Sequence, residues 1–153
     1  MTKTEDEALR SLTALCARGE RCTGDMSAKM RQWGLDDDAQ ARIMAYLTDH
    51  RFVDDMRFSR AFVAEKIRLN KWGPKKIDQA LAAKGVDAAT RHAALGEVDP
   101  QRYEEALRPL LAAKRMTISA ADNYEANGKL IRFALSRGFE METIRKCISS
   151  TTY

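Results

Sequence analysis

A row of basic side chains is the feature of this sequence best suited to binding a charged partner. Arg57, Arg60, Arg68 and Lys71, with Ala64 between them, follow one another at steps of three or four residues. On an α-helix these steps bring the side chains to one face, within an arc of about 80°. Like charges at this spacing repel each other by about 0.2–0.5 kcal/mol per pair, so helix stability does not explain the row. The row favours contact with phosphate groups or acidic side chains.

The basic segment continues beyond this row. From residue 57 to residue 76 there are seven basic residues and one acid, Glu65. Trp72 stands at the end of the row, where an indole can stack on a base or pack against the protein. Lys129 and Arg132 share a helical face later in the chain. The predicted binding residues are Arg57, Arg60, Arg68, Lys71, Trp72, Lys75, Lys76, Lys129 and Arg132. The alternative is a solvated helix face without a partner.

The acidic runs and the histidines have simpler explanations than metal binding. Residues 36–38 and 54–55 are acidic, but neither run has the glycine and the spaced carboxylates of a calcium loop. Both runs precede expected helices, where acids cap free amides and complement the helix dipole. His50 and His92 have no ligand-spaced partner on a shared face. We therefore expect no metal site.

The remaining candidates for chemistry are three cysteines. Cys16, Cys22 and Cys147 are odd in number and lack the close pairing of a metal or redox motif, which predicts reduced thiols. They have no histidine partner nearby in the sequence, and no Gly-rich phosphate loop is present. We expect no catalytic residue and no cofactor, so the protein is predicted to act by binding and not as an enzyme.

The composition is that of a helical cytoplasmic protein. Of its 153 residues, 44% are hydrophobic and 31% charged, with only three prolines and eight glycines. No β-branched residues alternate with polar ones, so long helices joined by short turns are predicted. The net charge of +4 is too small to establish a polyanionic partner. The first residues lack the apolar segment of a signal peptide, and no window is apolar enough to span a membrane.

One pattern occurs three times along the chain. Two apolar residues four apart are followed, four residues later, by glycine and another apolar residue. The three copies are Met26, Met30 and Gly34-Leu35; Ile77, Leu81 and Gly85-Val86; and Leu130, Ala134 and Gly138-Phe139. The glycines are 51 and 53 residues apart (34 to 85 and 85 to 138). Each glycine is expected to end its helix by adopting the left-handed backbone conformation. The next apolar residue then folds back on the last helical turn. Three copies at this period indicate internal repeats.

The repeats predict an all-α fold of three tandem three-helix repeats. The first repeat, residues 1–53, has helices expected near 5–18, 25–33 and 37–49. The second, 54–98, has helices near 54–70, 74–84 and 87–95. The third, 99–153, has helices near 100–114, 124–137 and 140–149. Pro100 is tolerated in a first helical turn, and Asp99 is a good cap before it.

The repeats are expected to pack against one another. A unit of about 50 residues buries a poor core alone. The helix at 54–70 has one apolar stripe containing Phe58, Phe62 and Leu69, and a second stripe on roughly the opposite side. A helix that is apolar on two sides packs between its own repeat and a neighbour. An elongated, curved array is therefore predicted, with the basic residues along one side.

The second repeat resembles the RecX family of regulatory proteins. The resemblance is carried by residues 54–63 (DDMRFSRAFV) and 68–77 (RLNKWGPKKI), with support from 46–47, 51–54 and 81–86. The segment 129–139 of the third repeat also fits. The first repeat departs from the family, because residues 21–26 (RCTGDM) replace a serine-containing turn that leads to Glu-Leu. The resemblance therefore does not extend to the residues that lead into the second helix.

The resemblance implies a regulator of recombinational DNA repair. RecX proteins are arrays of three-helix repeats that bind RecA filaments on single-stranded DNA. They restrain filament growth, ATP hydrolysis and strand exchange, and no active site is known in the family. The resemblance thus implies the RecA filament as partner, with single-stranded DNA as a further candidate. We expect a monomer that does not contact a membrane.

Two other functions remain as alternatives. The helix–glycine turn–helix units are similar in outline to a helix-turn-helix motif that binds duplex DNA. However, the helices after the glycines begin with Asp or Glu, which phosphate repels, and carry few side chains suited to base edges. A generic helical-repeat scaffold for protein partners is the second alternative. Salt dependence of DNA binding separates the scaffold from a protein that contacts phosphates.

Overall fold

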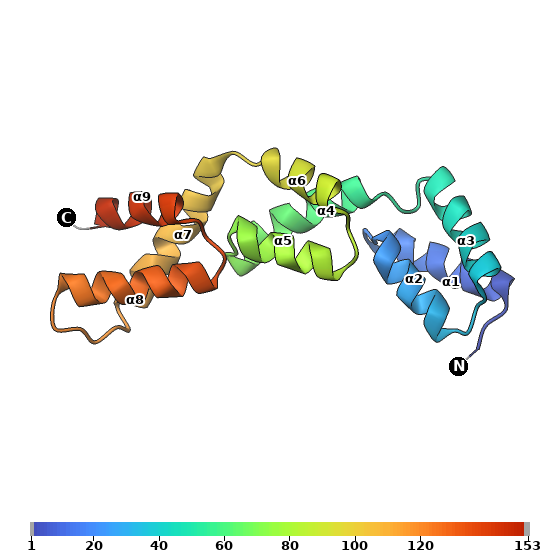
Figure 1. Ribbon diagram of the computed structural model, residues 1–153, viewed down its shortest axis with the longest axis horizontal. Helices are drawn as coiled ribbons and strands as arrows, with labels where there is room; N and C mark the ends of the chain where they lie inside the picture. Colours follow the sequence, from blue (N-terminus) through green and yellow to red (C-terminus); the bar gives the residue numbers. More distant parts are fainter. Residues whose placement is uncertain (1, 152–153) are drawn as a thin grey trace. The chain divides into compact units, whose positions relative to one another are not determined.

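The chain is helical throughout the part that the structure describes (Figure 1). The structure is a computed structural model that describes the backbone of residues 2–151 and the side chains of residues 2–148. The helices are α1 (Glu5–Arg18), α2 (Thr23–Gln32), α3 (Asp37–Asp49), α4 (Asp55–Glu65), the π-helical turn η1 (Lys66–Asn70), α5 (Pro74–Ala83), α6 (Ala88–Gly96), α7 (Pro100–Arg115), α8 (Asn123–Ser136) and α9 (Met141–Thr151). The predicted all-α class is confirmed. Residue 1 and residues 152–153 of the predicted outer repeats lie outside the described residues.

Packing divides the chain into two units. Unit 1 comprises residues up to 61 together with 81–91, and unit 2 comprises 62–80 together with the residues from 92 onward. The core of unit 1 is formed largely by α1, α2 and α3, through Ala8, Leu12, Met26, Met30, Ile43, Leu47 and Val53. In unit 2, α7 packs against α8, α9 and η1. Its fully buried side chains include Leu107, Leu111, Leu130, Phe139 and Ile144.

The three predicted glycine caps are confirmed. Gly34, Gly85 and Gly138 have φ values of 78°, 85° and 89°, in the left-handed region that favours glycine. The amide of the next residue donates to a carbonyl five residues back: Leu35 to Met30, Val86 to Leu81, and Phe139 to Ala134. These bonds fold each following apolar residue onto the helix that has just ended. The repeated pattern therefore corresponds to a repeated backbone motif.

The helix between residues 54 and 70 is not regular, which corrects the prediction. The α-helix ends at Glu65, and residues 66–70 form the wider turn of η1. Lys71 then adopts a left-handed conformation with φ 56° and its amide donates to the carbonyl of Lys66. The wider turn rotates later side chains away from an α-helical register. Leu69, predicted to lie on a buried stripe, is accordingly 58% exposed, while Ile67 stays buried.

The second helix is capped by a residue from another helix. Cys22 occupies the N-cap position of α2 but its side chain makes no capping hydrogen bond. The Asp55 carboxylate accepts from the Thr23 amide at 2.8 Å and from the Thr23 hydroxyl at 2.7 Å. Asp54 accepts from the Arg57 amide at 3.0 Å, so both acids of the run at 54–55 cap free helix amides, Asp54 in α4 and Asp55 in α2. Helix α2 begins at Thr23, two residues earlier than predicted.

Two glycines allow close backbone approaches within the units. In unit 1 the Cα of Gly24 faces the backbone of Lys84 and Gly85, and a Cβ on Gly24 would overlap the Lys84 carbonyl. In unit 2 a Cβ on Gly73 would overlap the backbone of Gly138 and its neighbour. Each contact pairs a glycine near the start of a helix, α2 or α5, with a cap glycine of the repeated pattern. We call each of these glycine–glycine backbone contacts a glycine joint; one occurs in each unit.

Candidate functional site

Two ammonium groups lie over the indole ring of Trp72 in unit 2. The Lys66 Nζ is 5.1 Å from the centre of the Trp72 ring, and the Lys76 Nζ is 4.8 Å from it. Lys66 also lies over the ring of Phe62, at 5.2 Å. These are cation–π distances, at which the electron-rich ring face attracts a positive charge. The two lysines are therefore held beside a half-buried aromatic ring.

Backbone hydrogen bonds on both sides fix the turn that carries Trp72. The Trp72 amide donates to the Lys66 carbonyl at 3.1 Å, which closes the wide turn of η1. The Gly73 amide donates to the Arg137 carbonyl at 2.8 Å, and the Lys75 amide to the Gly138 carbonyl at 3.1 Å. The turn is anchored to its own helix and to the end of α8. These hydrogen bonds therefore fix the position of the backbone that carries the Trp72 side chain.

The surroundings of Trp72 are strongly basic. We use the name Trp72 cluster for Lys66, Arg68, Lys71, Trp72, Lys75 and Lys76. Residues 66–77 contain five basic residues and no acid. Arg68 and Lys75 are exposed, while the lysines at 66, 71 and 76 are half-buried. An aromatic ring among exposed cations can bind phosphates and stack on an unpaired base.

Arg57 is held by groups of its own unit. Its Nε lies 2.6 Å from the Glu20 Oε1, and its terminal nitrogen donates to the carbonyls of Arg51 and Phe52 at 3.0 and 3.3 Å. These bonds join the start of α4 to the end of α3 and to the residues after α1. Arg57 and Arg60 belong to unit 1, and the other seven predicted binding residues belong to unit 2.

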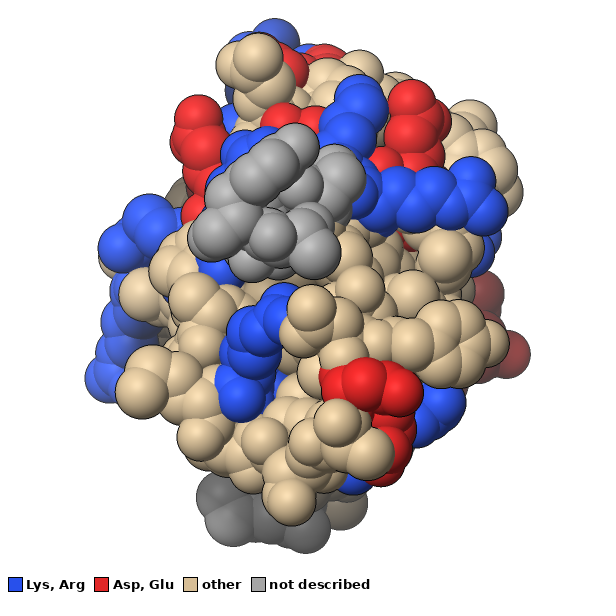
Figure 2. Space-filling model, turned by 90° about the vertical axis from the view of Figure 1, so that its left-hand side faces the viewer, with Lys and Arg blue, Asp and Glu red and all other residues tan. Residues whose placement is uncertain are grey.

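The predicted basic residues of α8 are partly neutralised. The Lys129 Nζ donates to the Ser119 carbonyl at 2.8 Å and lies 3.6 Å from Glu125. Arg132, on the same helix, is exposed. Figure 2 shows positive and negative side chains interspersed on the face that it draws.

Lys66 is a member of the cluster that spacing did not single out. It lies six residues before Trp72, and six residues of α-helix would turn its side chain well away from the ring. The π-helical turn and the left-handed Lys71 bring the two side chains together. Without knowledge of that turn, the sequence contains no signal for this contact.

The cysteines and acids show no sign of a reactive or metal-binding site in the described residues. Cys22 and Cys147 are buried, and burial raises the pKa of Cys22 to about 11. Burial also raises the pKa of Cys147 and of Cys16. A thiol that stays protonated is a poor nucleophile and a poor metal ligand. No group of three His, Cys, Asp or Glu residues between 2 and 148 could hold a metal ion.

Family models match most of the second and third repeats. The model described as "RecX, second three-helix domain" matches residues 54–95, and "RecX, third three-helix domain" matches residues 102–148. The first match contains the whole Trp72 cluster. None of the described helices is long and apolar enough to cross a membrane.

Similar proteins are known from several bacteria. A protein named Regulatory protein RecX from Acinetobacter baylyi is 29% identical over 143 residues, covering 92% of this chain and 86% of the relative. One from Clostridium tetani is 28% identical over 127 residues, and the match spans 82% of this chain but only 58% of that relative. The crystal structure of RecX from Lactobacillus salivarius has a TM-score of 0.85 at 20% identity, covering 95% of both chains. The chain therefore has the helical fold of this crystal structure.

Proposed function

Because the chain belongs to the RecX family of regulatory proteins, we propose that it binds RecA filaments on single-stranded DNA and restrains their activity. The restrained steps are filament extension, ATP hydrolysis and strand exchange in recombinational DNA repair. The observation that carries this proposal is the Trp72 cluster inside the matched second domain. Its charge and its ring suit a partner that displays phosphates, unpaired bases or acidic side chains.

We propose that the Trp72 cluster supplies the main contacts. Arg68 and Lys75 are exposed, and no described acid pairs with them. Arg60 and Arg132 remain proposed contacts. Arg57 and Lys129 are assigned a smaller contribution, because a partner would first have to compete with their internal hydrogen bonds.

The other parts of the proposal concern the whole chain. We propose three repeats, residues 1–53, 54–98 and 99–153, that act by binding without catalysis and without a cofactor. The protein is proposed to act in the cytoplasm as a monomer. The relatives named above are regulatory proteins, which supports a role other than catalysis.

The first test measures ATP hydrolysis by RecA on single-stranded DNA. Substoichiometric protein should lower the rate. Replacing Arg68, Lys71 and Lys75 with Gln should raise the concentration for half inhibition about tenfold, since three charge contacts of about 0.5 kcal/mol each sum to roughly the free energy of a tenfold change. A control with the same change of charge replaces Arg10, Arg18 and Arg31 with Gln; these three arginines are exposed and lie outside the Trp72 cluster. Unchanged ATP hydrolysis at saturating protein would contradict the function.

A second test separates DNA contact from protein contact. If the cluster meets phosphates, log affinity for oligo-dT should fall with log salt by about 0.7 per contact, and the triple variant should lower that slope by about 2. If the affinity for oligo-dT did not depend on salt while the protein still inhibited ATP hydrolysis by RecA, the cluster would contact acidic surfaces of RecA. A footprint on a defined duplex operator would instead favour the helix-turn-helix alternative.

A further inference from the structure

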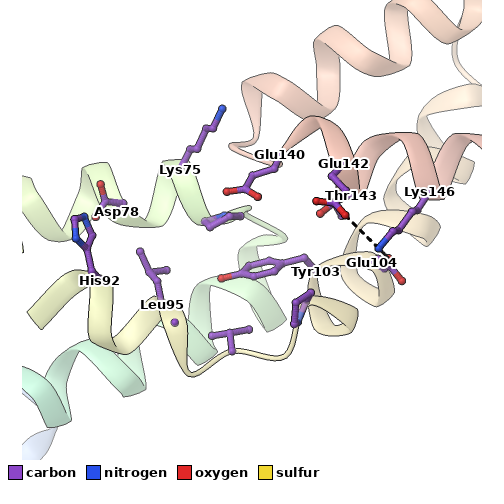
Figure 3. Close-up of a pocket in the computed structure, with 14 residues that line it drawn as sticks. Lys75, Asp78, His92, Leu95, Tyr103, Glu104, Glu140, Glu142, Thr143 and Lys146 are labelled. Carbon is purple, nitrogen blue, oxygen red and sulfur yellow. Dashed lines mark ion pairs between the residues drawn. The ribbon is translucent and has the colours of Figure 1, made fainter. Parts of the chain in front are cut away.

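Unit 2 has a second charged surface, and its sign is opposite to that of the Trp72 cluster. A pocket of about 610 Å³ lies among α5, α6, α7 and α9 (Figure 3). Four carboxylates line it, from Asp78, Glu104, Glu140 and Glu142, against the two ammonium groups of Lys75 and Lys146. The lining therefore has two more acids than lysines, in a chain whose net charge is +4. A local excess of negative charge attracts a cation.

A buried hydroxyl in this pocket makes no hydrogen bond to any described residue. Tyr103 is 7% exposed, and its Oη is buried without a hydrogen-bond partner. Figure 3 shows its ring projecting from α7 into the pocket, with the hydroxyl end directed away from its own helix. An unsatisfied buried polar group is unfavourable, which makes a polar ligand at this position favourable. Burial, reinforced by the Glu140 carboxylate, raises the pKa of Tyr103 to about 12, so the hydroxyl stays neutral.

The carboxylates at the two ends of the pocket differ in whether a cation pairs with them. Lys146 lies 3.7 Å from Glu104 and 3.7 Å from Glu142, and Arg108 also lies 3.7 Å from Glu104, so the carboxylates at one end are paired internally. Glu140, in the turn before α9, is exposed, and no described cation pairs with its carboxylate. An exposed carboxylate and a buried hydroxyl without a partner thus occur in one pocket. Leu95 and Val98 supply apolar wall between α6 and α7.

We propose that this pocket receives an arginine side chain of a protein partner. The guanidinium carries five N–H donors in a planar fork, so it can donate to the Tyr103 hydroxyl and to the Glu140 carboxylate together. Its methylene stem fits the apolar wall. A phosphate would be repelled by the acids, so this surface suits protein and not nucleic acid. The inference goes beyond the proposed function and does not depend on RecA being the partner.

The test titrates the full chain with a short peptide that has blocked ends and one arginine as its only charged residue, and follows the amide chemical shifts of the protein in NMR spectra. Saturable changes are expected in residues 74–78, 92–104 and 140–146, with a dissociation constant of about 1–10 mM for so small a ligand. The same peptide with citrulline, which keeps the shape without the charge, should give no saturable change. The lysine peptide should bind at least about threefold more weakly, because it lacks the planar fork.

Two variants test the assigned contacts. Tyr103→Phe and Glu140→Gln should each weaken binding of the arginine peptide about fivefold. Glu105→Gln, an exposed acid on α7 that does not line the pocket, should bind as the unchanged protein does. Thermal melting checks that each variant is folded. Absence of saturation, equal binding of the citrulline or lysine peptide, or unchanged binding by both variants would overturn the proposal.

Discussion

Trp72 shows how a single residue can organise charges that would otherwise repel. Each cation–π contact at an exposed site is worth about 0.5–1 kcal/mol, which exceeds the repulsion between two solvated ammonium groups. Lys66 and Lys76 therefore stay near the ring although no acid of the described residues pairs with them. The same ring face is what an unpaired base would stack on. A base that arrives would have to displace one lysine, which could then pair with the adjacent phosphate.

This exchange predicts a change in Trp72 fluorescence. In a Trp33→Phe background, Trp72 is the only tryptophan, and oligo-dT should quench its emission if bases stack on the ring. Trp72→Ala should weaken oligo-dT binding about fivefold or more, since stacking is worth about 1–3 kcal/mol per base. Trp72→Phe should retain part of the affinity. If Trp72→Ala bound oligo-dT as tightly as the unchanged protein, and oligo-dT did not quench the single-tryptophan protein, base stacking on Trp72 would be excluded. Only charge contacts would then explain the binding.

At the scale of the elements, the sequence predicts the helices well because caps and periodicity are local. The cap glycines at 34, 85 and 138 confirm the motif, and Asp99 caps α7 as predicted, by accepting from the Gln101 amide. What the sequence did not reveal was the end of α4. The residues after the π-helical turn, Gly73 and Lys75, donate hydrogen bonds to the end of α8, which is a contact between segments about 60 residues apart. No local pattern contains that information.

The π-helical turn makes a prediction that distinguishes it from a continuous α-helix. Leu69→Gln should change the free energy of unfolding by less than about 0.5 kcal/mol, because Leu69 is exposed. Ile67→Gln should cost about 3 kcal/mol or more, since Ile67 is 3% exposed and its replacement would bury an amide. Urea denaturation of the two variants measures both. A large loss from Leu69→Gln would restore the predicted apolar stripe.

The glycine joints make a second prediction about elements. Gly73→Ala should destabilise the protein by about 1–3 kcal/mol, because the new methyl group would overlap the backbone around Gly138 and force it to move. Gly96→Ala is the matched control, since a Cβ there meets nothing within 4 Å. It should be neutral or slightly stabilising. Equal melting temperatures for the two variants would mean that the joint at Gly73 is loose.

For the molecule as a whole, the candidate site is harder to predict than the fold. Spacing places basic residues on a helical face but says nothing about acceptors elsewhere in the chain. Glu20 lies 37 residues before Arg57 and binds its guanidinium, and the Ser119 carbonyl takes the ammonium of Lys129. The excess of basic residues in 66–76 was visible in the sequence. The acid-lined pocket was not, because its lining comes from four helices that only the tertiary fold brings together.

The stability of the whole molecule should depend on carboxylates spread along it. The pKa of Glu5 is lowered by hydrogen bonding from Arg42, and the pKa values of Glu7, Asp54 and Asp87 are lowered mainly by backbone amides. A carboxyl whose pKa is lower in the folded state stabilises the fold above its unfolded value, near 4. That contribution is lost as the pH falls through the folded value.

The melting temperature should therefore be constant near neutral pH and fall as the pH drops below about 4.5. Asp87→Asn offers a matched test, because asparagine caps a helix about as well as aspartate but does not titrate. The variant should melt near the unchanged protein at pH 7 and lose less stability between pH 5 and pH 3. Since Asp87 accepts from the Thr90 amide at 2.7 Å, a pH dependence identical in the two proteins would show that this bond does not distinguish carboxylate from amide. The acid sensitivity would then arise from the other carboxylates, beginning with the Glu5–Arg42 pair.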